Sequence, residues 1–315
     1  TFRNHFGSSL LAQPIWASAQ PIPGAAFDML RLAAACGGRR AIARCQCYLA
    51  LPVRPLSSTA TSPFINGTFE GNIAADGALG TPEYRLHFKN AFGKPISPWH
   101  DIRLQTCQYG IFNAVIEIPK MTTAKMEVAT KEVNNPIAQD MKKGKVREYH
   151  GPIFWNYGLL PQTWEDPNAV DAMTGCKGDN HPLDVVEIGS AALPIGTVVP
   201  VKPLGILAMI DEGELDWKVI AIAINDPLAD ELDDLKHLEE KYPEVVSGIR
   251  EWFRWYKTPD GKPLNTFGFE DQALPRAKAN EVISEAFDAW RNLRFGKSQH
   301  NGLWTQTVTA WTDGL

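Results

Sequence analysis

Two short stretches of the sequence place several carboxylates next to apolar segments. The first is Asp179-Asn-His-Pro-Leu-Asp184, which lies between Gly178 and the apolar pair Val185-Val186. The second is Asp211-Glu-Gly-Glu-Leu-Asp216-Trp-Lys218, which separates two apolar runs. Acids at the ends of buried strands are costly unless a partner neutralises them, and a bound metal ion does this well. The pattern therefore indicates a metal site, and the alternative is a set of exposed turn acids.

The residue types in these stretches favour a hard cation and an anionic substrate. Neither stretch has the Cys and His spacing of a zinc site, so oxygen ligands dominate and Mg²⁺ or Mn²⁺ is the natural ion. Asp216 and Lys218 are two residues apart on a predicted strand, which places both on one face, and Lys125 and Glu127 have the same spacing. Carboxylates interleaved with cations predict a phosphorylated substrate held against metal ions.

The surrounding pattern predicts strands first and helices last. Apolar, β-branched runs predict strands over Phe112–Ile118, Val198–Lys202, Gly205–Ile210 and Trp217–Ile224. This order favours a β-barrel or sheet, from about residue 84 to 225, with helices packed against it.

Two helices are predicted near the C-terminal end of this region. One begins near Pro243 and continues through Phe253, and the other covers about 277–295 and stops at Gly296. The acid run 226–240 is interpreted as a solvated helix face with leucines on its apolar side.

Charge is unevenly distributed along the chain. The 315 residues have a net charge of −5, but residues 1–80 contain six arginines, no lysine and three acids, which gives +3. The segment is rich in Ala, Ser, Pro and Gly, a composition typical of organelle transit segments. We expect residues 1–80 to be a retained N-terminal extension and residues 81–315 to be the main domain. The alternative is a disordered leader.

Composition excludes several classes of protein. The five cysteines are scattered and odd in number, so a disulfide framework is not expected, and Cys45 and Cys47 lack matching metal ligands. No run of about 18 apolar residues occurs, so no transmembrane helix is expected. The negative net charge argues against a general nucleic-acid-binding protein.

The order of the motifs resembles that of the soluble inorganic pyrophosphatases of family I, eukaryotic type. The stretch Asp179–Asp184 is similar to that family's diagnostic sequence, in which aspartates surround a proline and an aliphatic residue. The resemblance covers roughly Glu83–Lys297, where further stretches match in order: Ile116–Pro119, Ala124–Glu127, Asn135–Ile137, Lys142–Lys145, Asn156–Gly158, Pro161–Asn168, Asp211–Lys218 and Trp252–Lys257.

The resemblance implies a mainly β fold with flanking helices (α+β), built on an OB-like five-stranded β-barrel. It implies Mg²⁺-dependent hydrolysis of pyrophosphate to two phosphates, with Mn²⁺ or Zn²⁺ as substitutes. Two Mg²⁺ ions that bind the nucleophilic water would be held by Asp179, Asp184 and Asp216, and further ions by Asp211 and Glu117. Phosphate oxygens would be held by Lys125, Arg147, Tyr157, Lys218, Tyr256 and Lys257, while Glu127 would orient its neighbours.

The chain departs from this family at His181. The family has an aspartate there, which binds both water-activating metals and helps to take the proton from the water. A neutral imidazole supplies one nitrogen donor and no charge, and it cannot bridge two Mg²⁺ ions, which prefer oxygen. We expect His181 to weaken metal binding and the catalytic rate together. The alternative is that His181 binds a softer ion or serves as the base itself.

A second departure lies in the loop between Arg147 and Tyr157, which is shorter than in the family. The family has a tyrosine four residues before the position of Tyr157, and here that position is Ile153. Whether Tyr149 reaches into the site in its place is left open.

Two functions follow from these observations. One is an organellar pyrophosphatase of reduced activity, and the other is a weakly active or inactive accessory subunit of an organellar complex. We expect residues 1–80 to bind other protein subunits, on the matrix side of a mitochondrion rather than in a plastid. The alternative is that they cover the chain's own barrel. A homodimer is also compatible with the sequence.

Overall fold

The computed structural model describes residues 69–307, all within the unit Pro55–Leu315 that the chain's contacts define. The predictions made for residues 1–68, including those for Cys45 and Cys47, lie outside the described residues. No helix in the described part is both long and apolar enough to cross a lipid bilayer.

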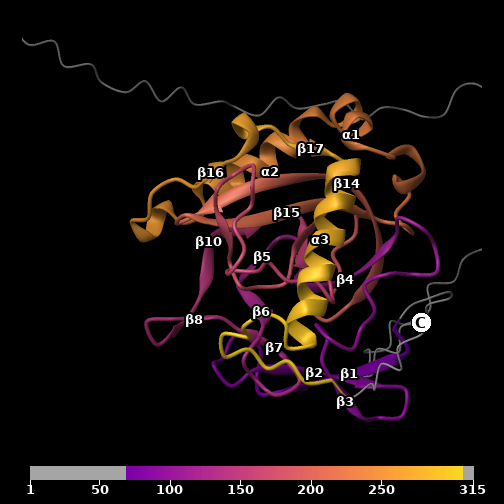
Figure 1. The fold of residues 1–315 in the computed structure, drawn as a ribbon, viewed down its shortest axis with the longest axis vertical. Helices are drawn as coiled ribbons and strands as arrows, with labels where there is room; N and C mark the ends of the chain where they lie inside the picture. The colour runs from indigo at the N-terminus through magenta and orange to yellow at the C-terminus, as the bar shows by residue number, and fades with distance from the viewer. Residues whose placement is uncertain (1–68, 308–315) are drawn as a thin grey trace, which may run out of the picture. The chain divides into compact units, whose positions relative to one another are not determined.

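A closed five-stranded β-barrel forms the centre of the fold (Figure 1). Strand β15 pairs with β13, β13 with β11, β11 with β4 and β4 with β14, and the pairing of β14 with β15 closes the ring. The barrel strands are β4 (Phe112–Ile118), β11 (Asn156–Leu159), β13 (Asp184–Glu187), β14 (Val198–Asp211) and β15 (Glu214–Ala223). The predicted barrel and the mainly β class with flanking helices are confirmed.

The remaining strands form a smaller sheet, two short pairs and short additions to the barrel sheet. In the smaller sheet the order is β1, β2, β7, β6, with β3 beside β2. These strands are β1 (Gly71–Asp76), β2 (Arg85–Asn90), β3 (Pro95–Ile96), β6 (Met126–Val128) and β7 (Ile137–Gln139). The others are β5 (Thr122–Ala124), β8 (Met141–Lys142), β9 (Lys145–Val146), β10 (Glu148–Ile153), β12 (Lys177–Gly178), β16 (Thr266–Phe267) and β17 (Leu274–Pro275). Because β1 belongs to the smaller sheet, regular structure begins before the predicted boundary at residue 80.

The predicted helices occur where Pro and Gly indicated them. The helix α2 (Pro243–Trp255) begins with its proline, and α3 (Arg276–Arg294) ends just before Gly296, whose φ is +68°. The acid run forms two short helices, η1 (Ala229–Glu231) and α1 (Leu235–Lys241), rather than one continuous helix. Two further 3₁₀ turns are η2 (Thr258–Asp260) and η3 (Phe269–Asp271).

Alternation along the barrel strands separates the apolar core from the polar residues of the site. In β15, Trp217, Val219 and Ala221 pack in one cluster with Ile283 and other apolar residues of α3. The residues between them face the other side of the strand, because successive side chains of a strand alternate. Asp216 and Lys218 belong to this second face, so the packing of α3 determines which face of β15 is left for chemistry.

Candidate active site

All thirteen residues that the sequence singled out line a single cavity of about 140 Å³. They come from six barrel or sheet strands and from the loops beside them, so the cavity exists only in the folded chain. These residues are Glu117, Lys125, Glu127, Arg147, Tyr157, Asp179, His181, Asp184, Asp211, Asp216, Lys218, Tyr256 and Lys257.

A buried lysine lies between two of the aspartates. The Nζ atom of Lys218 donates to Asp184 Oδ2 and to Asp216 Oδ1, and it lies 3.1 Å from the hydroxyl of Tyr157, which itself donates to Asp184. Burial alone would lower the pKa of Lys218, but Asp184 and Asp216 outweigh burial and raise the pKa well above its ordinary value. Lys218 therefore carries its positive charge within the cavity.

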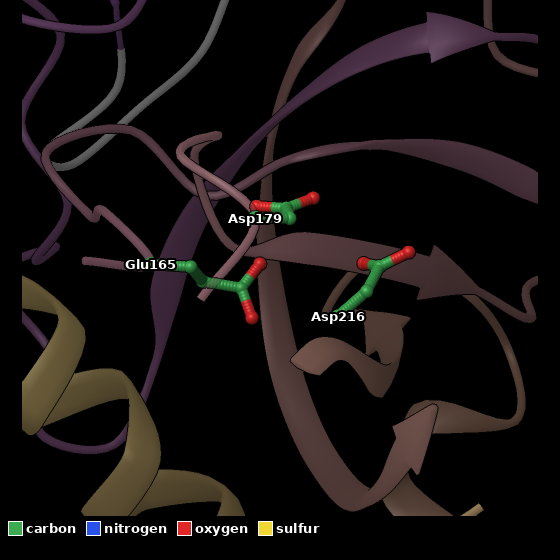
Figure 2. Close-up of side chains that lie close together, drawn as sticks. All are labelled: Glu165, Asp179 and Asp216. Atoms are coloured by element: carbon green, nitrogen blue, oxygen red, sulfur yellow. The ribbon is translucent and has the colours of Figure 1, made fainter. Parts of the chain in front are cut away.

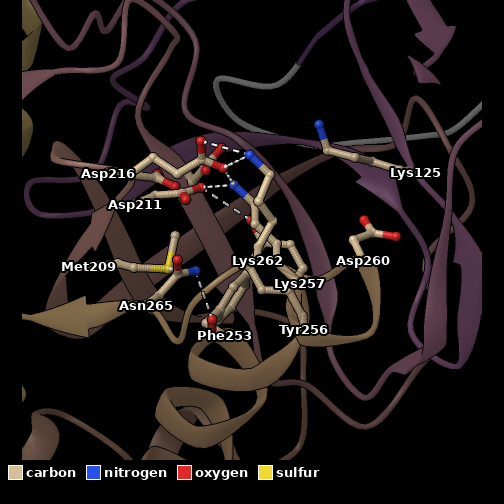
Figure 3. Close-up of polar contacts among 12 residues, drawn as sticks. Lys125, Met209, Asp211, Asp216, Phe253, Tyr256, Lys257, Asp260, Lys262 and Asn265 are labelled. Atoms are coloured by element: carbon tan, nitrogen blue, oxygen red, sulfur yellow. Dashed lines mark hydrogen bonds and ion pairs between the residues drawn. The ribbon is translucent and has the colours of Figure 1, made fainter. Parts of the chain in front are cut away.

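A second lysine and a tyrosine follow directly after α2 and meet the end of β14 (Figure 3). Lys257 forms an ion pair with Asp211 Oδ2, and the Tyr256 hydroxyl donates to the same oxygen at 3.4 Å. The other oxygen of Asp211, Oδ1, is buried and has no partner among the described residues. The amide of Asn265 donates to the Phe253 carbonyl at 3.0 Å and approaches Met209 Sδ at 3.5 Å, which fixes the end of α2 against β14.

The third cationic group is held by an acid that the sequence analysis did not identify. Lys125 pairs with Glu127 and also with Asp140 at 3.0 Å. Arg147 pairs with the same oxygen of Asp140 at 2.9 Å. Burial would raise the pKa of Asp140, but Lys125 and then Arg147 lower it below its ordinary value. Asp140 therefore positions both cations at the cavity wall.

Glu117 lies on β4 and is buried. Its Oε1 atom accepts a hydrogen bond from the backbone N–H of Val128 at 2.6 Å. Burial, followed by the charge of Asp184, raises the pKa of Glu117 well above its ordinary value. A carboxyl in this environment is stabilised as an anion only when a cation is close to it.

His181 and Asp179 occupy the loop after β12. The backbone N–H of His181 donates to Asp179 Oδ1 at 2.9 Å, while its imidazole is exposed and forms no hydrogen bond or ion pair with another described residue. Burial and the neighbouring Asp184 raise the pKa of Asp179 to about 7. His181 thus lies at the mouth of the site and adds no negative charge to it.

The structure also shows which residue of the short loop between Arg147 and Tyr157 reaches the cavity. Ile153 is buried and does not line the cavity, whereas Tyr149 does. The ring of Tyr149 packs edge-on against Trp252 and Tyr256, with centroids 4.9 Å and 5.8 Å apart. Burial raises the pKa of Tyr149 to about 12, so its hydroxyl stays protonated and available as a donor.

A group of three carboxylates offers the clearest fit to a metal ion. Glu165, Asp179 and Asp216 each direct one oxygen into a common space, and these oxygens lie within 4.8 Å of one another (Figure 2). Burial and the charges of Asp179 and Asp216 raise the pKa of Glu165 well above its ordinary value. An all-oxygen donor set that includes a buried oxygen without a partner among the described residues, Glu165 Oε2, is chemically suited to a hard divalent cation.

The residues missed by sequence reasoning had weak local signals. Glu165 belongs to the stretch Pro161–Asn168, which matches the family as a motif without marking any of its residues as a ligand. Asp140 is a single acid before the basic stretch Lys142–Lys145, and only the folded chain shows that it joins two cations. The available signals were the place of Glu165 inside a matched stretch and that of Asp140 between two of them.

Comparisons with known proteins agree with this geometry. A family model described as inorganic pyrophosphatase matches residues 114–291. "Soluble inorganic pyrophosphatase 6, chloroplastic" of Arabidopsis thaliana is 50% identical over 222 residues, which are 70% of this chain and 74% of that protein. "Soluble inorganic pyrophosphatase 1, chloroplastic" of Chlamydomonas reinhardtii is 45% identical over 265 residues, 84% of this chain and 93% of the relative. The crystal structure of type I inorganic pyrophosphatase from Toxoplasma gondii is 46% identical and superimposes with a TM-score of 0.69, covering 71% of this chain and 99% of that one. The chain therefore belongs to the soluble inorganic pyrophosphatases of family I.

Proposed function

We propose that this chain hydrolyses inorganic pyrophosphate to two phosphates with Mg²⁺ as its cofactor, at a reduced rate. The observation that supports this most strongly is the convergence of acids and cations on one cavity. Five carboxylates of the predicted metal set face it together with Lys125, Arg147, Lys218 and Lys257. A substrate that carries several negative charges and is bound with divalent cations requires both kinds of group.

The cations of the site are proposed to hold phosphate oxygens. Lys218 and Lys257 are each paired with aspartates in the structure, so both are fixed in position before a substrate arrives. Arg147 and Lys125 are oriented in the same way by Asp140. Cations that are fixed in advance stabilise charge on a transferred phosphoryl group without reorganising during the reaction.

The acids are proposed to hold the cofactor. Asp179, Asp184 and Asp216 would bind the ions that activate water, and Asp211 and Glu117 would bind the ions that accompany the substrate. When bound, Mg²⁺ supplies a Lewis acid that eases deprotonation of water and offsets the charge of the phosphate oxygens. The unpartnered Oδ1 of Asp211 supports its role as a ligand.

His181 is the reason for proposing a reduced rate. It lines the cavity next to Asp179 but offers a nitrogen donor without charge where the resemblance places a carboxylate. The proposed consequence is weaker metal binding and slower proton removal from water. The alternative is that His181 binds a softer ion or serves as the base, and its exposed imidazole favours this role. Comparing the rates of hydrolysis with different metal ions distinguishes this role from an impaired site.

The same residue supports a second candidate function, a pyrophosphatase-like accessory subunit of an organellar complex. In that case residues 1–80 would bind the other subunits. An organelle is our proposed location for either function, and the names of the Arabidopsis and Chlamydomonas relatives favour a plastid over the mitochondrion that the sequence analysis preferred.

Phosphate release by the purified full chain tests the proposal. The assay is made with pyrophosphate and Mg²⁺, and then with Mn²⁺ and with Zn²⁺. We expect slow release with Mg²⁺. No release with any of the three ions would reject the enzymatic function and favour the accessory subunit. Faster release with Mn²⁺ or Zn²⁺ than with Mg²⁺ would favour His181 as the ligand of a softer ion.

A further inference from the structure

Glu165 lies outside the predicted site set and does not line the cavity, yet its carboxylate lies beside those of Asp179 and Asp216, which do. Figure 2 shows Glu165, Asp179 and Asp216 turned toward one another from three separate segments of the chain. Their closest ligand oxygens are all within 4.8 Å of one another, which is the separation of ligands around one metal ion.

The side chain of Glu165 is held in a fixed position. Its Oε1 atom accepts a hydrogen bond from the backbone N–H of Trp217 at 2.9 Å. Its own backbone N–H donates to the carbonyl of His181 at 2.9 Å, and its carbonyl accepts from the N–H of Asn180 at 3.0 Å. These bonds fasten Glu165 to both β15 and the loop that carries Asp179, so its direction is a property of the fold.

The second oxygen of Glu165 is the unusual feature. Oε2 is buried and has no hydrogen-bond partner among the described residues, and Glu165 as a whole is 6% exposed. A buried oxygen that lacks a partner is costly, and buried polar groups in folded proteins are nearly always satisfied. The oxygen therefore requires a proton or a cation.

Charge in the group favours a cation. Three carboxylates meet here, and Lys218, the cationic side chain that contacts Asp216, is also paired with Asp184. Among the residues that the structure describes, the side chain of Asp179 accepts a hydrogen bond only from the backbone N–H of His181. Because buried acids repel one another strongly, a divalent ion would satisfy all three residues at once.

We propose that Glu165 binds a divalent cation directly, together with Asp179 and Asp216. This inference rests on the proposed function and adds one ligand to its set of Asp179, Asp184 and Asp216. In the structure Lys218 contacts Asp184 Oδ2 and Asp216 Oδ1, whereas Glu165 Oε2 has no partner among the described residues. Glu165 thus supplies an oxygen ligand in a chain whose position 181 has none.

Binding of Mn²⁺ to the full chain without pyrophosphate tests the proposal. Free Mn²⁺ is measured by electron paramagnetic resonance during titration of wild type and Glu165→Gln. Glutamine retains the shape of the side chain and the acceptor for Trp217 N–H, but it removes the anionic ligand. We expect the tightest Mn²⁺ site to weaken at least tenfold. Glu239→Gln is the matched control, because it removes the same charge from an exposed residue of α1 and should bind Mn²⁺ as the wild type does.

Thermal melting shows whether the variant is folded and gives a second readout. Without metal, Glu165→Gln should melt cooperatively, and the rise in melting temperature on adding Mn²⁺ should be smaller than in wild type, because a ligand stabilises the fold in proportion to its affinity. If Glu165→Gln does not fold, Glu165→Asp replaces it. Aspartate retains the charge but withdraws the oxygen by one methylene, and weaker Mn²⁺ binding is again expected.

Unchanged Mn²⁺ affinity in a folded Glu165 variant would overturn the proposal and show that Oε2 carries a proton instead. Absence of Mn²⁺ binding to the wild type would overturn it as well. The proposed function is judged separately by phosphate release. Weakened Mn²⁺ binding in a chain that releases no phosphate would reject the enzymatic function and support the Glu165 site.

Discussion

The chemistry of single residues decides how active this chain can be. His181 is exposed at the mouth of the cavity, and its backbone rather than its imidazole contacts Asp179. The position is therefore open enough to accept a shorter carboxylate without disturbing the core. This makes it a suitable place to restore a ligand by substitution.

We expect His181→Asp to raise the rate of pyrophosphate hydrolysis with Mg²⁺ by at least tenfold. The aspartate adds a negative oxygen ligand beside Asp179, and such ligands suit Mg²⁺ better than imidazole does. Phosphate release at saturating Mg²⁺ is the measurement. His181→Asn is the control, because it adds an oxygen without charge and should give a smaller gain. A wild-type rate that His181→Asp leaves unchanged or lowers contradicts the impairment.

Tyr149 is expected to donate a hydrogen bond to a phosphate oxygen. Its hydroxyl forms no hydrogen bond with another described residue, although it lines the cavity near Lys125 and Arg147. Hydrogen bonds to charged groups contribute about 1.5–3 kcal/mol, so Tyr149→Phe should lower kcat/KM about 10-fold to 100-fold. Tyr242→Phe, at an exposed tyrosine before α2, should leave kcat/KM unchanged. Equal values for Tyr149→Phe and wild type would show that the shortened loop has no substitute tyrosine.

Sequence reasoning located the predicted residues of the cavity because motif order carries information about residues far apart in the chain. It did not find Glu165 or Asp140. Each of these acids acts through partners that are distant in sequence, such as Trp217 for the first and Arg147 for the second. Nothing in local periodicity reports such contacts.

At the scale of elements, local sequence patterns predicted the positions of strands and helices wherever one face or all residues of the element are buried. The predicted strand Phe112–Ile118 is β4 without change, since all of its residues are buried. The predicted strands Val198–Lys202 and Gly205–Ile210 are a single strand, β14, with an irregular register between Pro203 and Gly205. Proline cannot donate a hydrogen bond to a neighbouring strand but is tolerated at a β-bulge. The sequence therefore marks a local irregularity correctly, but the strand continues through it.

Another element-scale feature connects the C-terminal segment to the core through His100. Its Nδ1 accepts from the indole N–H of Trp290 on α3 at 2.8 Å, and its Nε2 lies 2.9 Å from the carbonyl of Trp304. These contacts require a neutral ring with its proton on Nε2. A second proton on Nδ1 would face the Trp290 N–H, so protonation breaks the link between α3 and residues 303–307.

We expect this histidine to make stability depend on pH. Burial lowers the pKa of His100 from 6.5 to about 3, and the backbone contact with Trp304 opposes this only in part. Because the folded pKa is depressed, the contribution is complete above pH 6.5 and is lost as pH falls toward 3, by up to about 1.4 kcal/mol per unit. Urea unfolding of wild type and His100→Gln between pH 7 and 4.5 measures it. Identical pH slopes for the two proteins would contradict the role of His100.

At the scale of the whole molecule, the fold class was predictable and the edge of the domain was not. Strand β1 has the sequence Gly-Asn-Ile-Ala-Ala-Asp, with little β-branched or aromatic character, and three of its residues are partly buried while three are exposed. It forms a strand because all six residues pair with β2, from Gly71 opposite Asn90 to Asp76 opposite Arg85. Pairing with a distant partner leaves no signal in the segment itself.

Two truncations should therefore differ in stability. Removing residues 1–68 retains β1, whereas removing residues 1–80 deletes it together with Phe69, whose ring packs 5.9 Å from that of Phe88. The side chains of Leu86 and Phe88, which are buried in the full chain, would become more exposed to solvent. We expect the longer truncation to melt at least 5 °C lower, because a loss of 1 kcal/mol lowers the melting temperature by roughly 2–4 °C at this size. Equal melting temperatures would show that β1 adds no stability.

The shorter truncation also serves to test what the N-terminal extension does in the cell. Residues 1–80 are basic, whereas residues 81–315 carry a net charge of −8, so the extension suits an acidic surface on another subunit. We expect the full chain to migrate in native size analysis, after gentle extraction, as part of an assembly larger than a homodimer. The chain without residues 1–68 should migrate at its own size, while its phosphate release stays that of the full chain because the thirteen residues predicted for the site all lie beyond residue 68. A full chain that migrates as a free monomer or homodimer would reject the assembly and favour an extension that serves only its own barrel.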